Sequence, residues 1–210
     1  MPADTHFMSD RPSTVDAGID VVSEILDAAH LTTAVFGRLE LGMPWRLRIP
    51  ARSYLSFYVV ARGGGWIEVE GADAEANGAA GGTHLSQALS AGDAVLLPRG
   101  TAHVLRDANG GHALAQEIEY SACPAPWIGE GAHFGGAGPT TAIVTGQFTF
   151  SGGGARNPLL DTLPSLIHLP AGAVGSHPQL AGVVPLILSE SARPGPGASM
   201  VLARLADMLL

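Results

Sequence analysis

The stretch that decides the fold is GDAVLLPRGTAH, residues 92–103. Its opening Gly-Asp dipeptide predicts a tight turn, because glycine accepts positive φ and aspartate bonds nearby backbone. The apolar residues 94–97 predict a buried strand, which the Pro-Arg-Gly corner ends by reversing the chain. His103 then stands at the start of a return strand. In an antiparallel barrel its imidazole would point into the interior, where polar groups contact ligands.

The same pattern of short apolar segments and turn residues continues on both sides of this stretch. From about residue 32 to 150, short apolar segments are separated by Gly, Pro, Asn or Asp. WRLRIP (45–50) alternates, with Trp45, Leu47 and Ile49 on one face and arginines on the other. Many short strands at this spacing predict a β-sandwich or barrel. Two Gly-rich segments are predicted to be connections between strands, namely 71–84 and 129–139.

Composition divides the chain into three parts. Residues 1–15 are polar and predicted to be disordered, and residues 16–150 are predicted to form a β-barrel preceded by an amphipathic helix that starts at Asp16. Residues 151–210 turn to helical spacing and predict a helical subdomain that ends in a linker helix. Helices are expected in three segments of this last part: 158–169, 177–190 and 197–210.

Composition also excludes several classes of function. Among 210 residues, 46% are hydrophobic, yet no apolar run is long enough to span a bilayer, and no apolar core of a signal peptide opens the chain. We therefore expect a cytoplasmic protein with no membrane partner. The net charge is −8, and the 11 basic residues, all arginines, are spread thinly. A nucleic-acid partner needs a basic face, so this chain alone is predicted not to bind DNA.

The spacing within residues 92–107 resembles the second sequence motif of the cupin superfamily, G-x5-P-x-G-x2-H-x3-N. The chain carries Gly92, Pro98, Gly100 and His103 at these positions, with Asp107 in place of the asparagine. The resemblance implies a mainly β fold, a cupin double-stranded β-helix or jelly-roll barrel. A helix would precede this barrel, and a small C-terminal helical subdomain would follow it.

The first cupin motif supplies three further metal ligands in the enzymes of that superfamily, and this chain does not match it. The ligand positions fall on Arg48, Pro50 and Ser56. Arginine has no accessible lone pair, proline has no donor atom and serine is a weak ligand. Because one imidazole does not replace about three protein ligands, no metal cofactor is predicted. A metal site built from other residues stays open as an alternative, with His84, His112, Glu117 and Glu119 as its candidates.

The order of segments over residues 16–210 resembles the N-terminal cupin domain of AraC-type transcription regulators. The segments that carry the resemblance are IDVVSEIL, FGRLELGMPW, FYVVARGGGWIEV, LSAGDAVLLPRGTAHVLRD, TGQFTF, NPLLDTLPSLIHL and VLARLADMLL. The resemblance implies a domain that senses a small molecule and dimerises, and that reaches DNA only through a helix-turn-helix region. The sequence stops on bare leucines where that region would begin, so we expect the DNA-binding part to be absent from this chain.

Five polar residues are predicted to face the interior and bind the effector: His103, Tyr58, Arg48, Ser56 and Gln116. Arg48 would pair with an anionic effector, whereas Tyr58 and His103 would orient it by hydrogen bonds. Each has a structural alternative. Arg48 would then be a solvated edge charge, Tyr58 a core aromatic, and His103 a donor to a backbone carbonyl.

The last helix predicts a homodimer, because its apolar stripe needs cover. The stripe comprises Met200, Leu202, Leu205, Met208 and Leu209, and the alternative is that it faces its own barrel. Two other functions remain open. One is a stand-alone metal-dependent cupin enzyme, such as an isomerase or dioxygenase. The other is a barrel that binds no ligand and acts only in dimer assembly.

Overall fold

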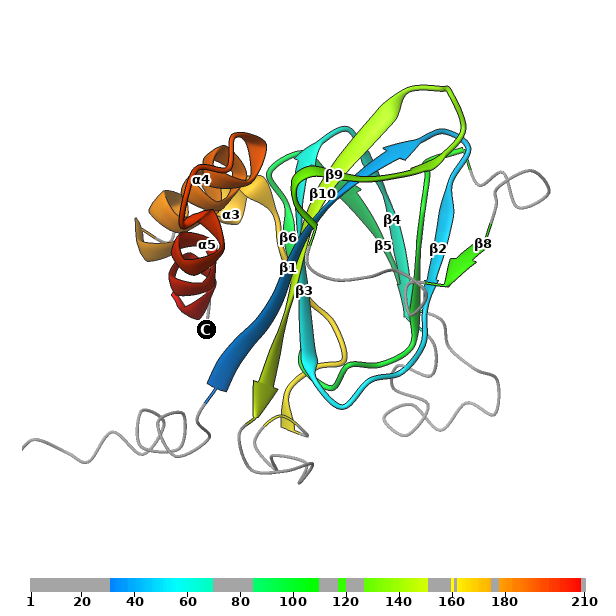
Figure 1. Cartoon of the computed structure of the whole chain (residues 1–210). Coiled ribbons are helices and arrows are strands. Elements are labelled where there is room, and N and C mark those ends of the chain that lie inside the picture. Colours follow the sequence, from blue (N-terminus) through cyan, green and yellow to red (C-terminus); the bar gives the residue numbers. More distant parts are fainter. Residues whose placement is uncertain are drawn as a thin grey trace, which may run out of the picture.

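The computed structural model describes residues 31–69, 85–109, 117–119, 127–150, 160, 162–174 and 178–208. Within these residues the strands form two sheets that face each other, and helices cover the outer side of one sheet (Figure 1). The prediction of a mainly β fold is confirmed, in the form of an open two-sheet sandwich compatible with a jelly roll. The predicted tail and the helix that would start at Asp16 lie outside the described residues.

The first sheet has six strands in the order β11-β6-β3-β10-β1-β9. These strands are β1 (Leu31–Gly42), β3 (Leu55–Arg62), β6 (Ala94–Leu97), β9 (Trp127–Gly135), β10 (Thr140–Phe150) and β11 (Ile167–Leu169). Neighbours in this sheet are antiparallel, except that β9 runs parallel to β1.

The second sheet has five strands in the order β5-β4-β7-β2-β8. These are β2 (Arg46–Ile49), β4 (Gly64–Val69), β5 (Leu85–Ser90), β7 (His103–Arg106) and β8 (Glu117–Glu119). β8 pairs parallel with β2, and the other neighbours are antiparallel.

Alternation along the strands separates two layers of core. In β3, Leu55, Phe57 and Val59 belong to the outer layer, whereas Tyr58 and Val60 belong to the layer between the sheets. Successive side chains of a strand point to opposite faces, so β3 contributes to both layers. The interior layer comprises Leu39, Leu41, Trp45, Leu47, Ile49, Tyr58, Val60, Ile67, Val69, Leu89, Val95, Leu97, Leu105 and Ile143.

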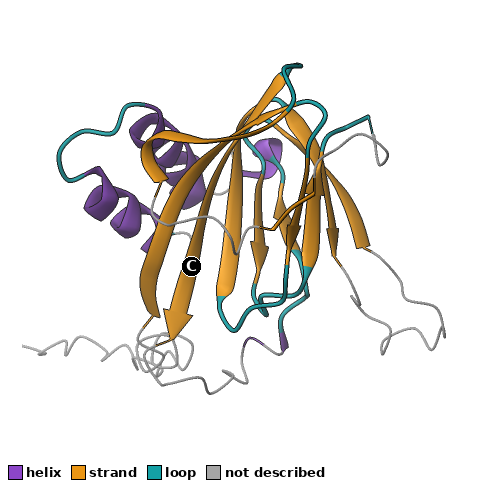
Figure 2. Ribbon diagram, turned by 45° about the vertical axis from the view of Figure 1, so that its right-hand side comes forward, coloured by secondary structure: helices purple, strands orange, loops and turns teal. Residues whose placement is uncertain are grey.

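The helices of the described C-terminal part are α3 (Ala171–Val174), α4 (Pro178–Ala192) and α5 (Ala198–Asp207). Both α4 and α5 were predicted, and α4 continues through its internal Pro185. They pack against the outer layer of the six-stranded sheet through Val183, Val184, Ile187, Leu202 and Ala206 (Figure 2). None of these helices combines the length and apolarity that crossing a membrane requires.

Two predicted segments differ in the structure. Part of the helix predicted over 158–169 is strand β11, which pairs with β6. Pro164 and Pro170 stand on either side of this strand, and proline does not fit a helix interior. The Gly-rich connection predicted over 129–139 includes most of strand β9. Its glycines allow close approach, since a Cβ on Gly135 would lie 2.2 Å from the Gly42 carbonyl oxygen.

Candidate functional site

The buried pair of Tyr58 and His103 joins the two sheets. The Tyr58 hydroxyl lies 2.8 Å from His103 Nε2, and the two rings meet edge to face with centroids 5.4 Å apart. His103 Nδ1 lies 2.7 Å from the Thr101 carbonyl oxygen. Because a carbonyl only accepts, Nδ1 carries the proton and donates to Thr101. This contact is the structural alternative that the sequence left open for His103.

The electrostatic state of His103 follows from its burial. Burial lowers the pKa of His103 from 6.5 to about 4, although the Thr101 carbonyl acts in the opposite direction. The imidazole is therefore neutral at pH 7, and its Nε2 has a lone pair. The Tyr58 hydroxyl donates its hydrogen to that lone pair.

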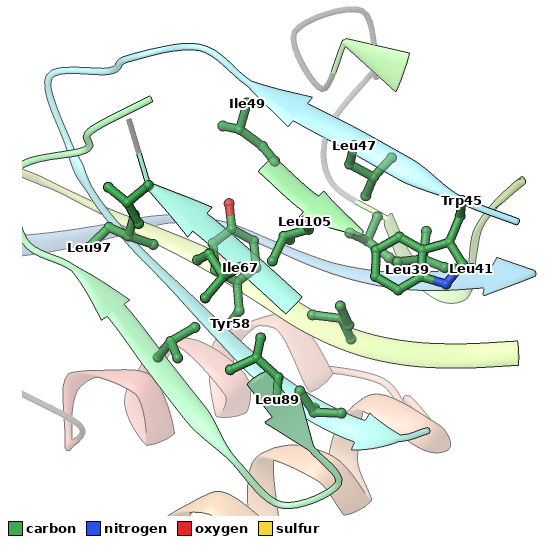
Figure 3. Packing of buried hydrophobic residues seen from close by; sticks show 14 residues of the cluster. Leu39, Leu41, Trp45, Leu47, Ile49, Tyr58, Ile67, Leu89, Leu97 and Leu105 are labelled. Atoms are coloured by element: carbon green, nitrogen blue, oxygen red, sulfur yellow. The ribbon is translucent and has the colours of Figure 1, made fainter. Parts of the chain in front are cut away.

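Strand pairing places further polar residues beside Tyr58. Ser56 on β3 is paired with Gln147 on β10, and Tyr58 is paired with Thr145. These four side chains share one face of the six-stranded sheet, because they alternate with residues of the outer layer. We call the set of Ser56, Tyr58, His103, Thr145 and Gln147 the polar end of the interior. Figure 3 shows the Tyr58 oxygen on the Ile49 side of the apolar cluster, with Trp45 at the opposite side.

A small cavity lies at the polar end. It is lined by Ile49, Tyr54, Ser56, Tyr58, Thr145, Gly146 and Gln147, and its volume is about 10 Å³. A cavity of this volume holds about one water molecule. The rest of the interior is filled by the apolar layer (Figure 3). A ligand larger than water therefore needs side chains of the polar end to move.

Three members of the polar end have unused hydrogen-bonding capacity. Ser56 and Thr145 are buried, with 5% and 3% of their surface exposed, and Gln147 is half-buried. Within the described part of the chain, none of these three side chains forms a hydrogen bond. Buried polar groups are nearly always satisfied by protein, water or a ligand. The cavity is the place where water or a ligand would reach them.

The predicted site residues divide into three groups. Ser56, Tyr58 and His103 lie together at the polar end. Arg48 is exposed between the buried Leu47 and Ile49, so the prediction that it faces the interior is wrong. The alternation of WRLRIP already placed it on the opposite face, as a strand requires. Gln116 lies outside the described residues, and its role stays a prediction.

Thr145 and Gln147 were missed from the sequence. TAIVTGQFTF (141–150) alternates, so that Ile143, Thr145 and Gln147 share a face. An apolar residue followed by two polar ones on an interior face is the signal that would have found them.

The residues around His103 do not fit the metal centre known in cupin enzymes. Both ring nitrogens of His103 are engaged, one by Thr101 and one by Tyr58. No group of three or more His, Cys, Asp or Glu side chains within reach of one ion occurs among the described residues. Of the other candidates, His84 and His112 lie outside those residues, as do the side chains of Glu117 and Glu119.

Asp107, at the motif's asparagine position, has a structural role. Its carboxylate accepts hydrogen bonds from the backbone amides of Trp45 and Asn109, each at 2.9 Å. It is buried, and it fixes the end of β7 against the chain entering β2. This motif position therefore stabilises the sandwich, and it does not belong to the polar end.

The chain is similar to known proteins in its sequence and in its structure. The sequence model of the family described as Cupin matches residues 20–210. A solved structure similar to this chain is that of the protein YhaK from Escherichia coli, at 11% identity and a TM-score of 0.38. The alignment covers 67% of this chain and 43% of that one, so this chain spans less than half the length of that protein. No curated protein matches.

Proposed function

Because this chain belongs to the cupin family, we propose that it is the small-molecule-sensing and dimerisation domain of a cytoplasmic AraC-like transcription regulator. The effector binds at the polar end, without a metal. The C-terminal helices carry the effect to a helix-turn-helix region outside this chain, which contacts DNA.

One observation carries the proposal: β3 and β10 each contribute to the polar end and to the contact with the helices. Ser56 and Tyr58 of β3 face the interior, while Leu55, Phe57 and Val59 pack in the layer that contains Val183 and Ile187 of α4. On β10, Thr145 and Gln147 face the interior, while Val144 and Phe148 belong to the helix layer. A displacement of either strand at the polar end therefore acts directly on the packing of α4 and α5.

The size of the cavity supports a sensing role. An effector larger than the water-sized cavity binds only when residues of the polar end move. Binding then favours one arrangement of β3 and β10 over another, which is the differential affinity that a ligand switch requires. A rigid, preformed site of the same chemistry would bind without transmitting anything.

The outer face of the helices supports dimerisation. Leu186, Met200, Val201 and Met208 are exposed by 54%, 72%, 47% and 60%. Leu202, in contrast, is buried against the chain's own sheet. The predicted stripe is thus split, and its exposed residues Met200 and Met208 are apolar surface that a second copy would cover. Sedimentation velocity at tens of micromolar is expected to show a dimer, and Met200→Glu is expected to shift it to monomer. A monomeric wild type would overturn this part.

A thermal-shift screen tests the sensing role. Small probes include acetate and glycolate as anions, and acetamide, glycerol and erythritol as neutral compounds. At a concentration of about 100 times the dissociation constant, a bound probe raises stability by about 2.7 kcal/mol and so raises the melting temperature. Gln147→Leu is expected to reduce the shift, whereas Gln87→Leu on β5 serves as the matched control. If no probe of either kind raises the melting temperature, the sensing role is wrong.

A second candidate function is a sandwich that acts only in assembly. The buried apolar cluster between the sheets favours it, because the cavity at the polar end has space for about one water only. The same screen separates the two candidates. An assembly domain gives no probe-dependent shift but still forms the dimer.

A further inference from the structure

Two arginines of the described chain, Arg52 and Arg99, have a buried Nε atom with no hydrogen-bond partner. Five arginines form ion pairs with Glu or Asp, namely Arg38, Arg46, Arg62, Arg106 and Arg204. Arg52 and Arg99 form none within the described residues. Arg99 donates to the Ser165 hydroxyl at 2.8 Å, and Arg52 has no side-chain partner there. We call Arg52 and Arg99 the arginine corner.

The arginine corner is half-buried, and its charge is not compensated by the described residues. The Nε atoms of both Arg52 and Arg99 are buried and have no hydrogen-bond partner. A buried guanidinium donor without a partner is unfavourable, because its hydration is lost and nothing replaces it. This cost persists in a chain that has 19 acidic residues from which a partner could come.

The backbone holds the two arginines on adjacent segments. The Arg52 amide donates to the Gly100 carbonyl at 2.8 Å, so the residue after Arg99 is bonded to Arg52. Gly100 has φ of 59°, and a Cβ there would lie 2.3 and 2.4 Å from the carbonyl oxygens of Arg52 and Tyr54. The corner is therefore a close backbone contact that depends on glycine at position 100.

Tyr54 links the arginine corner to the cavity. The Tyr54 side chain lines the cavity together with Ser56. Burial raises the pKa of the Tyr54 hydroxyl, and the positive charge of Arg52 acts on the same group in the opposite direction. Arg52 thus stands two residues before a residue that lines the cavity.

We propose that the arginine corner binds the anionic group, a carboxylate or a phosphate, of a small molecule whose uncharged part enters the polar end. This inference rests on the proposed function and names the chemical class of the effector. Guanidinium groups recognise both anions through paired N–H donors, and Arg52 and Arg99 each have a buried donor without a partner. The anion-binding role predicted for Arg48 belongs in this proposal to Arg52 and Arg99.

The test follows the side-chain Nε–H signals of arginine in ¹H–¹⁵N spectra of the wild-type chain. Acetate, glycolate and inorganic phosphate are the anionic probes. Acetamide is the neutral counterpart of acetate, and sodium chloride matches the ionic strength. The Arg52 and Arg99 signals are expected to shift saturably with acetate or phosphate, and not with acetamide or chloride. The anion that saturates the shift at the lower concentration distinguishes a carboxylate effector from a phosphate effector.

Variants assign the signals and measure the contribution. Arg52→Gln and Arg99→Gln are each expected to weaken anion binding by about tenfold, since each removes a charged hydrogen bond. The matched control is Arg193→Gln, an exposed arginine between α4 and α5, which is expected to leave binding unchanged. If a variant does not fold, the signal of that arginine is assigned instead by correlation with its own backbone resonances in the wild-type chain, and the wild-type titration decides.

The outcomes separate this inference from the proposed function. If glycerol or acetamide raises the melting temperature through Gln147 while both arginine signals follow only ionic strength, the anion site is wrong and the sensing role stands. If anions shift the arginine signals saturably, the anion site is supported. If no probe changes either measurement, both proposals are wrong.

Discussion

At the scale of single residues, the pair of Tyr58 and His103 determines the chemistry of the polar end. Nδ1 donates to Thr101 and Nε2 accepts from Tyr58, so the neutral imidazole has both nitrogens satisfied. In this arrangement His103 acts as a hydrogen-bonding group. This state predicts the effect of removing the Tyr58 hydroxyl and the effect of pH on His103.

Replacing Tyr58 with phenylalanine tests the hydrogen bond. Tyr58→Phe leaves His103 Nε2 buried without a donor, which is expected to cost about 1–3 kcal/mol of unfolding free energy. Chemical denaturation at pH 7.5 measures the loss. Tyr54→Phe makes the same change at a half-buried tyrosine and is expected to cost less. Equal losses of unfolding free energy in the two variants would show that the hydrogen bond to His103 does not stabilise the fold.

The depressed pKa of His103 predicts a pH dependence of stability. Its pKa is about 4 in the folded state against 6.5 ordinarily, so the unfolded chain binds the proton more readily. The contribution is fully present above pH 6.5 and is lost as the pH falls from 6.5 towards 4, by at most about 3 kcal/mol. Denaturation curves between pH 7.5 and 4.5 measure it.

The control for this pH dependence is a second histidine. His103→Gln is expected to flatten the loss of stability below pH 6.5, because glutamine does not titrate. His133→Gln, at an exposed position on β9, is expected to keep the wild-type slope. Parallel slopes in wild type and His103→Gln would mean that His103 is not the group responsible.

Single residues also show what the sequence reveals about the site. The spacing of the second cupin motif located His103, and the spacing of the first cupin motif led to Ser56. Arg48 was wrongly placed in the interior, although the alternation of WRLRIP would have excluded it. Thr145 and Gln147 were missed, and their shared face with Ser56 and Tyr58 becomes clear only once β3 and β10 are paired. No pattern in the sequence pointed to Arg52 and Arg99 as candidate binding residues. Their lack of acidic partners depends on which carboxylates the fold brings near them, and no local pattern encodes that.

At the scale of elements, Asp93 ties the C-terminal segment to the sandwich. Its carboxylate accepts from the Ser90 amide at 3.0 Å, from the Ala171 amide at 2.8 Å and from His168 Nε2 at 3.1 Å. Ser90 is the last residue of β5, whereas His168 and Ala171 lie on β11 and α3. The Gly-Asp turn of the motif therefore also anchors the segment that leads to α4.

Removing this carboxylate is expected to loosen β11 and α3. Burial alone would raise the pKa of Asp93, but the hydrogen bonds from Ala171, Ser90 and His168 lower it overall. The ionised form therefore stabilises the fold at neutral pH, and that contribution is lost as the pH falls through the lowered pKa. Asp93→Ala is expected to cost about 1–3 kcal/mol and to speed hydrogen exchange over residues 167–174.

The control is Asp207→Ala, which removes a carboxylate from an exposed ion pair with Arg204. Exposed pairs contribute about 0–1 kcal/mol, so exchange over residues 167–174 should stay at the wild-type rate. Unchanged exchange there in Asp93→Ala as well would contradict the anchoring role of Asp93.

Elements differed in how well local pattern predicted them. Helices α4 and α5 follow from their apolar spacing, because each buries one face on the sheet. Strands β9 and β11 do not follow, because both exist through pairing with a distant partner. β9 pairs with β1 at one edge and β11 with β6 at the other. A Gly-rich or Pro-bounded segment becomes a strand when a sheet edge is available to it.

At the scale of the whole molecule, the interior between the two sheets lies on one side of the six-stranded sheet, and α4 and α5 lie on its other side (Figure 1). The interior of the sandwich holds the polar end, and the outer side of the six-stranded sheet holds α4 and α5. Among the described strands, β3 and β10 alone contribute residues both to the cavity lining and to the packing of these helices. This arrangement is the physical basis of the proposed signal from effector to dimer.

Hydrogen exchange across α4 and α5 tests that central claim most directly. The chain is compared without a probe and with the small molecule, from acetate, glycolate, acetamide, glycerol and erythritol, that raises the melting temperature most. The account predicts that exchange changes at residues of β3 and β10 and also at residues 183–206 of the two helices. Exchange that changes in the strands while α4 and α5 keep their rates would contradict it.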